Sequence, residues 1–240
     1  MVSKRKKILS FVITAVALLL LFLFAVNTGS LKVTPLQLFK GLFVKYDENV
    51  ATIFDLRFPR IFIAMFGGAA TAVSGVLLQA VMKNPLADPG IIGISSGASL
   101  MAVLITAFVP ALYFFTPLLA FLGGMIAFLL VYSLSWKGGL SPLRIILVGV
   151  AVNAMFTGLM SAFNSGTGSN YSGVASIVNA NITMKTWDDF TTLLWYVTIG
   201  LLASFFVTGQ CNLLALEDKT ARSLGVNVTR SRIIISVIAV

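Results

Sequence analysis

Two arginines and a loop rich in helix-breaking residues are best placed to recognise a partner or to shape a pathway. Arg57 and Arg60 flank a proline just before a long apolar run, and the planar guanidinium group of arginine can hold a carboxylate through two parallel hydrogen bonds. Residues 84–93 contain two prolines and two glycines, which forbid a continuous helix. Irregular backbone at membrane depth is tolerated where it is buried or lines a cavity, so we expect this loop beside a pathway.

A third segment, residues 217–225, has the pattern of a short exposed helix. Glu217 and Asp218 fall in its first turn and Arg222 in its last, where their charges suit the helix dipole. Gly225 then stands where a left-handed residue commonly ends a helix. By composition alone, the segment is equally typical of any amphipathic surface loop.

Catalytic and metal-binding constellations are absent from the sequence. It has no histidine and one cysteine, Cys211, which excludes a disulfide framework and a His/Cys metal site. No G-x-x-x-x-G-K-[ST] motif is present to cradle a phosphate. Asp188 and Asp189 are adjacent, so they do not share a helix face, and we expect them in an outer loop. We therefore predict no enzyme activity, catalytic residue, cofactor or metal.

The composition is that of a membrane protein. Hydrophobic residues make up 58% of the chain and charged residues 10%, whereas a soluble domain carries about 25% charged residues. A net charge of +9 is typical of basic cytoplasmic loops, and no basic face with interleaved aromatic residues indicates a nucleic-acid partner. The expected surroundings are the lipid bilayer.

Six apolar runs are long enough to cross a bilayer core, which takes about 20 residues. They are residues 8–26, 61–82, two runs within 89–136 with a break near 110–117, 145–163 and 190–209, and a seventh begins at 233. The sequence predicts an all-α polytopic transmembrane helical bundle, one domain over residues 1–240, with six complete spans and the start of a seventh. Small residues in 61–82 also predict close helix packing there.

The loops predict orientation, and the spans indicate the energy source. Eleven of the 17 Lys and Arg residues fall on the side of the N-terminus, which predicts a cytoplasmic N-terminus. In the outer loop 27–60, Thr34, Pro35 and Gln37 form a capping-box start of a short interfacial helix. The six runs contain no ionisable residue, so proton coupling is disfavoured, and a sodium-coupled transporter or channel stays an alternative.

Five short motifs carry a resemblance to a known family. They are Leu56–Arg60 (LRFPR), 74–79 (SGVLLQ), 84–98 (NPLADPGIIGISSGA), 147–151 (LVGVA) and 215–226 (ALEDKTARSLGV). From about residue 10 to the end, the sequence resembles the FecCD (BtuC-like) permeases of type II ABC importers, which take up iron-siderophores, heme and cobalamin. It is most similar to the siderophore and heme permeases of Gram-positive bacteria.

The resemblance implies roles for the segments above. Arg57 and Arg60 match arginines that pair with glutamates of an extracytoplasmic substrate-binding lipoprotein, although two snorkelling anchors at the membrane interface would look the same. A cytoplasmic gate is implied at Asn84, Leu86, Pro142 and Leu143, where the last two depart from the small polar residues common in the family. A coupling helix to the ATPase is implied at Glu217, Ala221, Arg222, Leu224 and Gly225, with Ala221 and Leu224 on the docking face.

The resemblance also implies a function and its partners. The chain would be the permease subunit of an iron-siderophore importer in the bacterial cell membrane, with heme and then cobalamin as alternative substrates. Its partners would be a second permease copy or a paralogue, ATPase subunits inside and the binding protein outside. Members of the family have ten helices, so we expect residues 1–240 to be the N-terminal part of such a domain, inactive and unstable alone.

Overall fold

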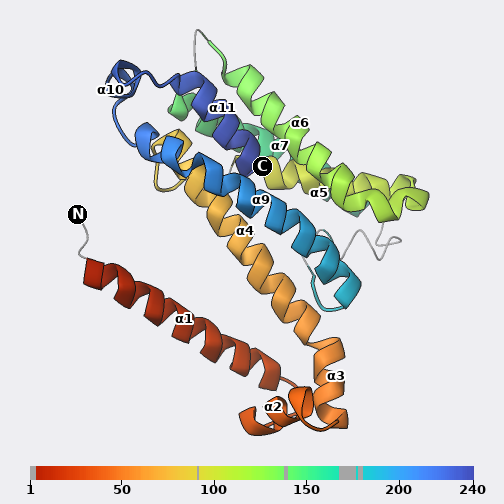
Figure 1. Cartoon of the computed structure of the whole chain (residues 1–240). Coiled ribbons are helices and arrows are strands. Elements are labelled where there is room, and N and C mark those ends of the chain that lie inside the picture. The colour runs from red at the N-terminus through yellow and green to blue at the C-terminus, as the bar shows by residue number, and fades with distance from the viewer. Residues whose placement is uncertain (1–3, 91, 138–139, 168–176, 178–180) are drawn as a thin grey trace. The chain divides into compact units, whose positions relative to one another are not determined.

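The computed structural model describes residues 4–90, 92–137, 140–167, 177 and 181–240. The described fold is helical, apart from one bridge between Trp136 and Leu140, which confirms the all-α prediction. In chain order (Figure 1), the elements are α1 (Lys4–Asn27), α2 (Pro35–Phe43), α3 (Glu48–Leu56), α4 (Phe58–Met82), α5 (Ile94–Phe108), the 3-10 helix η1 (Pro110–Phe115), α6 (Thr116–Ser135), α7 (Pro142–Thr167), α9 (Trp187–Leu214), α10 (Asp218–Ser223) and α11 (Val228–Ala239).

Five helical stretches are long and apolar enough to cross a membrane, namely α1, α3 with α4, η1 with α6, α7 and α9. The remaining predicted span is α5, whose 15 residues measure roughly 22 Å at the rise of an α-helix. All six runs are therefore helical, but one is shorter than the bilayer core of about 30 Å. The break predicted near residue 110 is confirmed, because η1 starts at Pro110.

The last helix begins earlier than the apolar pattern predicted. α11 starts at Val228 rather than at residue 233. The Asn227 side chain explains the earlier start, because its Oδ1 accepts the backbone N–H of Arg230 at 3.0 Å and so caps the helix. The first turns of α11 consequently contain Arg230 and Arg232, for which the hydropathy pattern predicts a loop.

The chain forms two compact units, and the first comprises Met1–Gly67 and Ile182–Leu194. Its buried side chains are Val26, Val33, Leu38, Val50, Ile53 and Phe58. The two short helices α2 and α3 meet closely at Gly41, where an added Cβ would lie 2.6 Å from Val50 Cγ2. This contact requires a residue without a side chain at position 41.

The start of α2 was predicted correctly only in part. The Thr34 hydroxyl accepts the backbone N–H of Gln37 at 3.1 Å, as the capping prediction requires. The Gln37 amide does not complete the capping box within the described residues, because its Nε2 donates to Asp47 Oδ2 at 2.8 Å. Asp47 in turn caps α3 by accepting the backbone N–H of Asn49 at 3.0 Å. The sequence predicts a loop rather than a helix there.

The outer side of α2 is apolar. Leu36, Phe39 and Phe43 are exposed, whereas Leu38 packs into the core of the first unit. An interfacial helix needs such an exposed apolar side. The placement of α2 on the membrane surface agrees with this feature and stays a prediction.

The second unit comprises Gly68–Asn181 and Trp195–Val240, and glycines set the spacing of its helices. α5 and α6 pack side by side (Figure 1), and an added Cβ at Gly123 would lie 2.6 Å from the Gly97 carbonyl oxygen. The close packing predicted for α4 is found at Ser74, whose hydroxyl donates to the carbonyl oxygen of Ala239 in α11, but not at Gly68 or Gly75, where an added Cβ would meet no atom within 4 Å. Close approach therefore occurs at the α5–α6 pair, where backbones can touch because the side chains are absent.

We expect Gly123→Ala to destabilise the protein and Gly158→Ala to leave it intact. A methyl group at position 123 would meet Met101 Cβ at 2.5 Å and force the two helices apart, at a cost of about 1–3 kcal/mol. Position 158 has nothing within 4 Å, and alanine there favours the helix by up to about 1 kcal/mol. Thermal unfolding in detergent, followed by tryptophan fluorescence, measures both. Equal melting temperatures would contradict the role of Gly123.

Candidate functional site

Arg57 lies between α3 and α4 and is half-buried. Its Nη1 donates to the carbonyl oxygen of Leu31 at 2.9 Å and also to that of Val26. Val26 stands in the last turn of α1, where carbonyl groups lack intrahelical partners. Arg57 therefore satisfies the C-terminus of α1 and the loop after it, and its guanidinium group is already occupied inside the first unit.

The glycine at position 29 accommodates this arginine. Gly29 has a φ of +130°, and an added Cβ would lie 2.6 Å from Arg57 Nη2. Arg60 is in a different situation, because among the described residues its hydrogen bond is a local, exposed one from Nε to the carbonyl oxygen of Leu56. Both arginines are half-buried, but they differ in their contacts: Arg57 binds carbonyl groups of α1 and the loop after it, and Arg60 binds a carbonyl group one helical turn away.

The first predicted gate loop is a series of tight turns. Asn84 Oδ1 accepts the backbone N–H of Leu86 at 2.9 Å, and Asp88 Oδ1 accepts that of Gly90 at 2.7 Å. These side-chain contacts hold the loop where the prolines exclude a helix. Leu86 is 78% exposed, whereas Ala87 is buried in the core of the second unit. Ala87 therefore anchors the loop in the core, and the adjacent Leu86 side chain is exposed.

The residues predicted for the second gate loop, Pro142 and Leu143, are the first two residues of α7, and the loop itself lies just before them. Arg144 Nη1 donates to the carbonyl oxygen of Ser135 at 3.0 Å, which joins this loop to the end of α6. Leu140 is buried in the same core as Ala87, and Leu143 is 66% exposed. Both predicted gate loops therefore belong to the second unit, and each presents one exposed leucine.

The predicted coupling helix is α10, which is shorter than residues 217–225. Glu217 is its N-cap residue and Arg222 lies in its last turn. Gly225 has a φ of +82°, as expected for a left-handed residue that follows a helix. The prediction that Ala221 faces a partner differs from the structure, because Ala221 is 1% exposed and belongs to the core. Leu224, the C-cap residue of α10, is 61% exposed and is an apolar side chain that a partner could contact.

A polar network that the sequence did not reveal joins α10 to both gate loops. Asp218 Oδ1 lies 2.7 Å from Lys83 Nζ and 3.0 Å from Arg232 Nη2. Lys83 directly precedes the first gate loop and also donates to the carbonyl oxygen of Leu216. Arg232 Nη1 donates to the carbonyl oxygen of Leu140 at 3.2 Å, just before the second. Residues more than 130 positions apart meet here, and no local pattern signals it.

The network is built from ionised side chains, of which one is buried. Arg232 is 4% exposed, and within the described residues its ion-pair partner is Asp218. Burial raises the pKa of Asp218, but the hydrogen bond from Lys83 and the charges of Arg232 and Lys83 lower it, so that this pKa lies below its ordinary value. The carboxylate is therefore charged at neutral pH.

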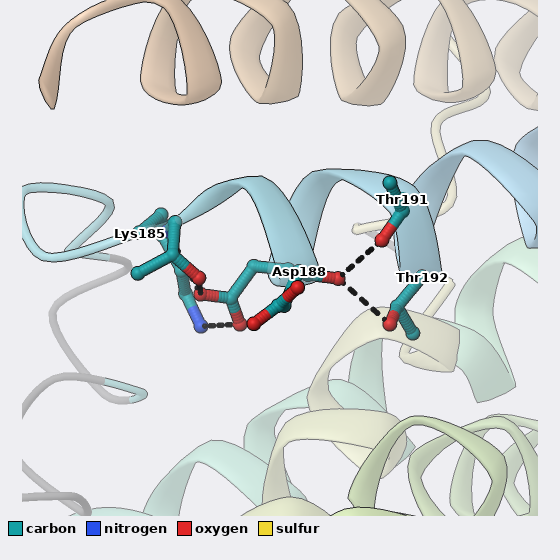
Figure 2. A network of polar contacts seen from close by, with 6 residues as sticks. Lys185, Asp188, Thr191 and Thr192 are labelled. Atoms are coloured by element: carbon teal, nitrogen blue, oxygen red, sulfur yellow. Dashed lines mark hydrogen bonds and ion pairs between the residues drawn. The ribbon is translucent and has the colours of Figure 1, made fainter. Parts of the chain in front are cut away.

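The acidic residues 188–189 stand at a helix start, where the Asp189 side chain and the Asp188 carbonyl oxygen accept hydrogen bonds. Both residues lie in the first turn of α9, which corrects the prediction that they stand in a loop. Figure 2 shows Asp188 and Lys185 at this helix start. Asp189 Oδ2 accepts the backbone N–H of Thr186 at 3.0 Å, as the acidic residue of a capping box does, and Asp189 Oδ1 lies 3.1 Å from Lys185 Nζ.

Comparisons with known proteins agree with this arrangement. The family model described as "FecCD transport family" matches residues 17–240. Over its 240 residues the chain is 38% identical to the "Probable heme-iron transport system permease protein IsdF" of Staphylococcus aureus strain NCTC 8325 / PS 47, of which it covers 73%. It is also 38% identical to the protein of that name from strain Newman, of which it covers 72%.

Among solved structures, the chain is similar to a transporter assigned to the metal-chelate type of ABC transporter, in an inward-facing conformation. The TM-score is 0.72 at 25% sequence identity, and the match covers 94% of this chain and 70% of the solved one. The helical arrangement of this chain is therefore that of an ABC permease.

We expect Arg57→Ala and Arg60→Ala to differ in stability. Loss of Arg57 leaves the carbonyl groups of Val26 and Leu31 without their donor, and losing hydrogen bonds to a charged group costs about 1.5–3 kcal/mol. Loss of Arg60 removes one exposed local hydrogen bond, so its melting temperature should match the wild type. Thermal unfolding of the purified variants measures this difference, and equal losses of stability would refute it.

Proposed function

The chain belongs to the FecCD transport family, and we propose that it forms the membrane pathway through which an iron chelate enters the cell on the energy of a separate ATPase. It is a multi-pass membrane protein and the permease of a metal-chelate ABC importer. The observation that carries the finer proposal is 38% identity, over the whole chain, to a heme-iron permease.

Heme and ferric siderophores are the candidate substrates. The named transport of the Staphylococcus aureus relative supports heme, whereas the motifs alone ranked siderophores first and cobalamin third. Because no cluster of His, Cys, Asp or Glu that could hold a metal is found in the described residues, we expect the iron to travel inside its chelate rather than to bind the protein directly.

ATP is the energy source that fits the residues. The apolar runs contain no ionisable side chain that could couple transport to a proton gradient, and family membership does not support the sodium-coupled alternative. Leu224 on α10 offers an exposed apolar contact for an ATPase subunit. A helix packed on the core by Ala221 can transmit rigid-body motion to a gate.

The same network supports the predicted orientation, because it places segments predicted to lie on one side of the membrane together. Asp218, Lys83, Arg232 and Leu140 bring α10 and both gate loops to one end of the second unit. The sequence assigns all of these segments to the side of the N-terminus. A cytoplasmic N-terminus then places α10 where an ATPase could reach it, in a bacterial cell membrane.

The outer partner is a substrate-binding protein, and Arg60 is its proposed contact. Arg57 is held by the C-terminus of α1, so its contribution to docking is to fix the outer segment from which Arg60 projects. Arg60 can hold a carboxylate of the partner bidentately. A second permease copy, or a paralogue, would complete the pathway.

We expect ATP-dependent heme uptake that depends on Leu224. The complete importer, with its binding protein, is reconstituted in vesicles and heme accumulation is measured. Leu224→Asp should reduce ATPase co-purification and uptake at least tenfold, because burying a leucine contributes about 1.5–3 kcal/mol, and Leu224→Met should retain both.

Three outcomes would contradict parts of this proposal. Equal ATPase co-purification with Leu224→Asp would refute the coupling role of α10. Uptake that persists without the ATPase would favour a sodium-coupled transporter or a channel. Uptake of a ferric siderophore but not of heme would correct the substrate while leaving the importer intact.

A further inference from the structure

We propose that Asp218 is a positioning residue that fixes α10 relative to both gate loops, so that a movement of α10 reaches the gate. The proposal rests on the proposed function, because it assumes that α10 is the coupling helix and that residues 84–86 and 142–143 form the gate. It adds a residue outside the predicted site, and it defines the connection by which two separate loops move together.

The first arm of the connection is Lys83. This residue has a φ of +49°, a left-handed conformation that is unfavourable for a residue with a side chain and persists where the surroundings determine it. Its Nζ is held 2.7 Å from Asp218 and also donates to the carbonyl oxygen of Leu216. Because Lys83 turns the chain from α4 into Asn84, the ion pair sets the direction in which the first gate loop leaves the helix.

The second arm is Arg232 on α11. It binds Asp218 at 3.0 Å through Nη2 and the carbonyl oxygen of Leu140 at 3.2 Å through Nη1, so one planar group joins α10 to the second gate loop. Its Nε makes no hydrogen bond to the described residues. The fixed spacing of the guanidinium nitrogens means that a displacement of Asp218 must move Leu140, or break a hydrogen bond.

Position, rather than stability, is what this network contributes. Of the three charged side chains only that of Arg232 is buried, at 5% exposed, against 38% for Asp218 and 29% for Lys83. An intact ion pair of this kind adds little net stability, because desolvation offsets its attraction, but loss of Asp218 leaves the buried charge of Arg232 without its partner and is destabilising. The best-attested use of such a pair is to specify one arrangement. Attachment of α10 is provided separately by Ala221, which is 1% exposed and packs in the core. An Asp218 variant should therefore keep α10 attached and lose its orientation.

The test measures how much chelate is transported for each ATP hydrolysed. In the complete reconstituted importer, Asp218→Asn removes the charge and keeps the side-chain size. We expect ATP hydrolysis to continue while transport per ATP falls about tenfold, within the usual range of coupling between sites. Glu48→Gln is the matched control, because it removes an exposed carboxylate charge from α3 and should leave the ratio unchanged.

A second readout follows the gate itself. A bimane label is placed on Leu86→Cys in a Cys211→Ser background that still transports, since Cys211 is the chain's one cysteine. Trapping the ATPase with ATP and vanadate should shift the emission in the otherwise wild-type importer and leave it unchanged with Asp218→Asn. A purely structural role would lower the melting temperature without separating ATP hydrolysis from the label's response.

The outcomes separate this inference from the proposed function. Normal transport per ATP and a normal bimane shift in Asp218→Asn would overturn the inference and leave the importer standing, whereas absence of ATP-dependent uptake in the wild type would refute the function itself. If Asp218→Asn does not assemble, Lys83→Met removes one arm only. Partial uncoupling by Lys83→Met would support the connection, and full coupling would overturn it.

Discussion

Every backbone N–H and C=O group in a lipid-exposed segment must find a partner inside the protein, and this constraint governs where the chain departs from helix. At three places near helix ends, basic side chains donate to carbonyl groups. Arg57 does so at the end of α1, Arg144 at the end of α6 and Lys83 just beyond α9. Cations favour the negative ends of helices. The Lys and Arg residues whose distribution predicts the membrane orientation therefore also hold the ends of helices and the loops next to them.

Hydrophobic sequence pattern and motif were sufficient for the membrane helices, because a span needs only length and apolar composition. The α3 helix was missed because its amphipathic nine residues fall below any such length. Its one local signal was Asp47 before an acidic first turn. The burial of Ala221 could not be predicted from the sequence either. On a six-residue helix the side that faces the core depends on the rest of the bundle.

The candidate site was predicted as separate segments, and what joins them lay outside the prediction. The sequence predicts Asp218 in the first turn of a helix, where its charge suits the helix dipole. Nothing in that local pattern indicates that Asp218 pairs with Lys83 and Arg232. Arg57 and Arg60 looked equivalent on either side of a proline. The course of the chain after α1 brings the carbonyl groups of Val26 and Leu31 to Arg57, whereas Arg60 binds a carbonyl group of its own helical turn.

The short connection between α10 and α11 bears on how motion passes through this end of the fold. Gly225 donates to the carbonyl oxygen of Arg222 at 2.9 Å and Val226 to that of Ala221 at 3.1 Å, while Asn227 caps α11. Each linking residue is therefore hydrogen-bonded, which leaves little freedom for a hinge. The backbone connection therefore keeps α10 and α11 adjacent, whereas the ion pair between Asp218 and Arg232 links the orientation of α10 to α11.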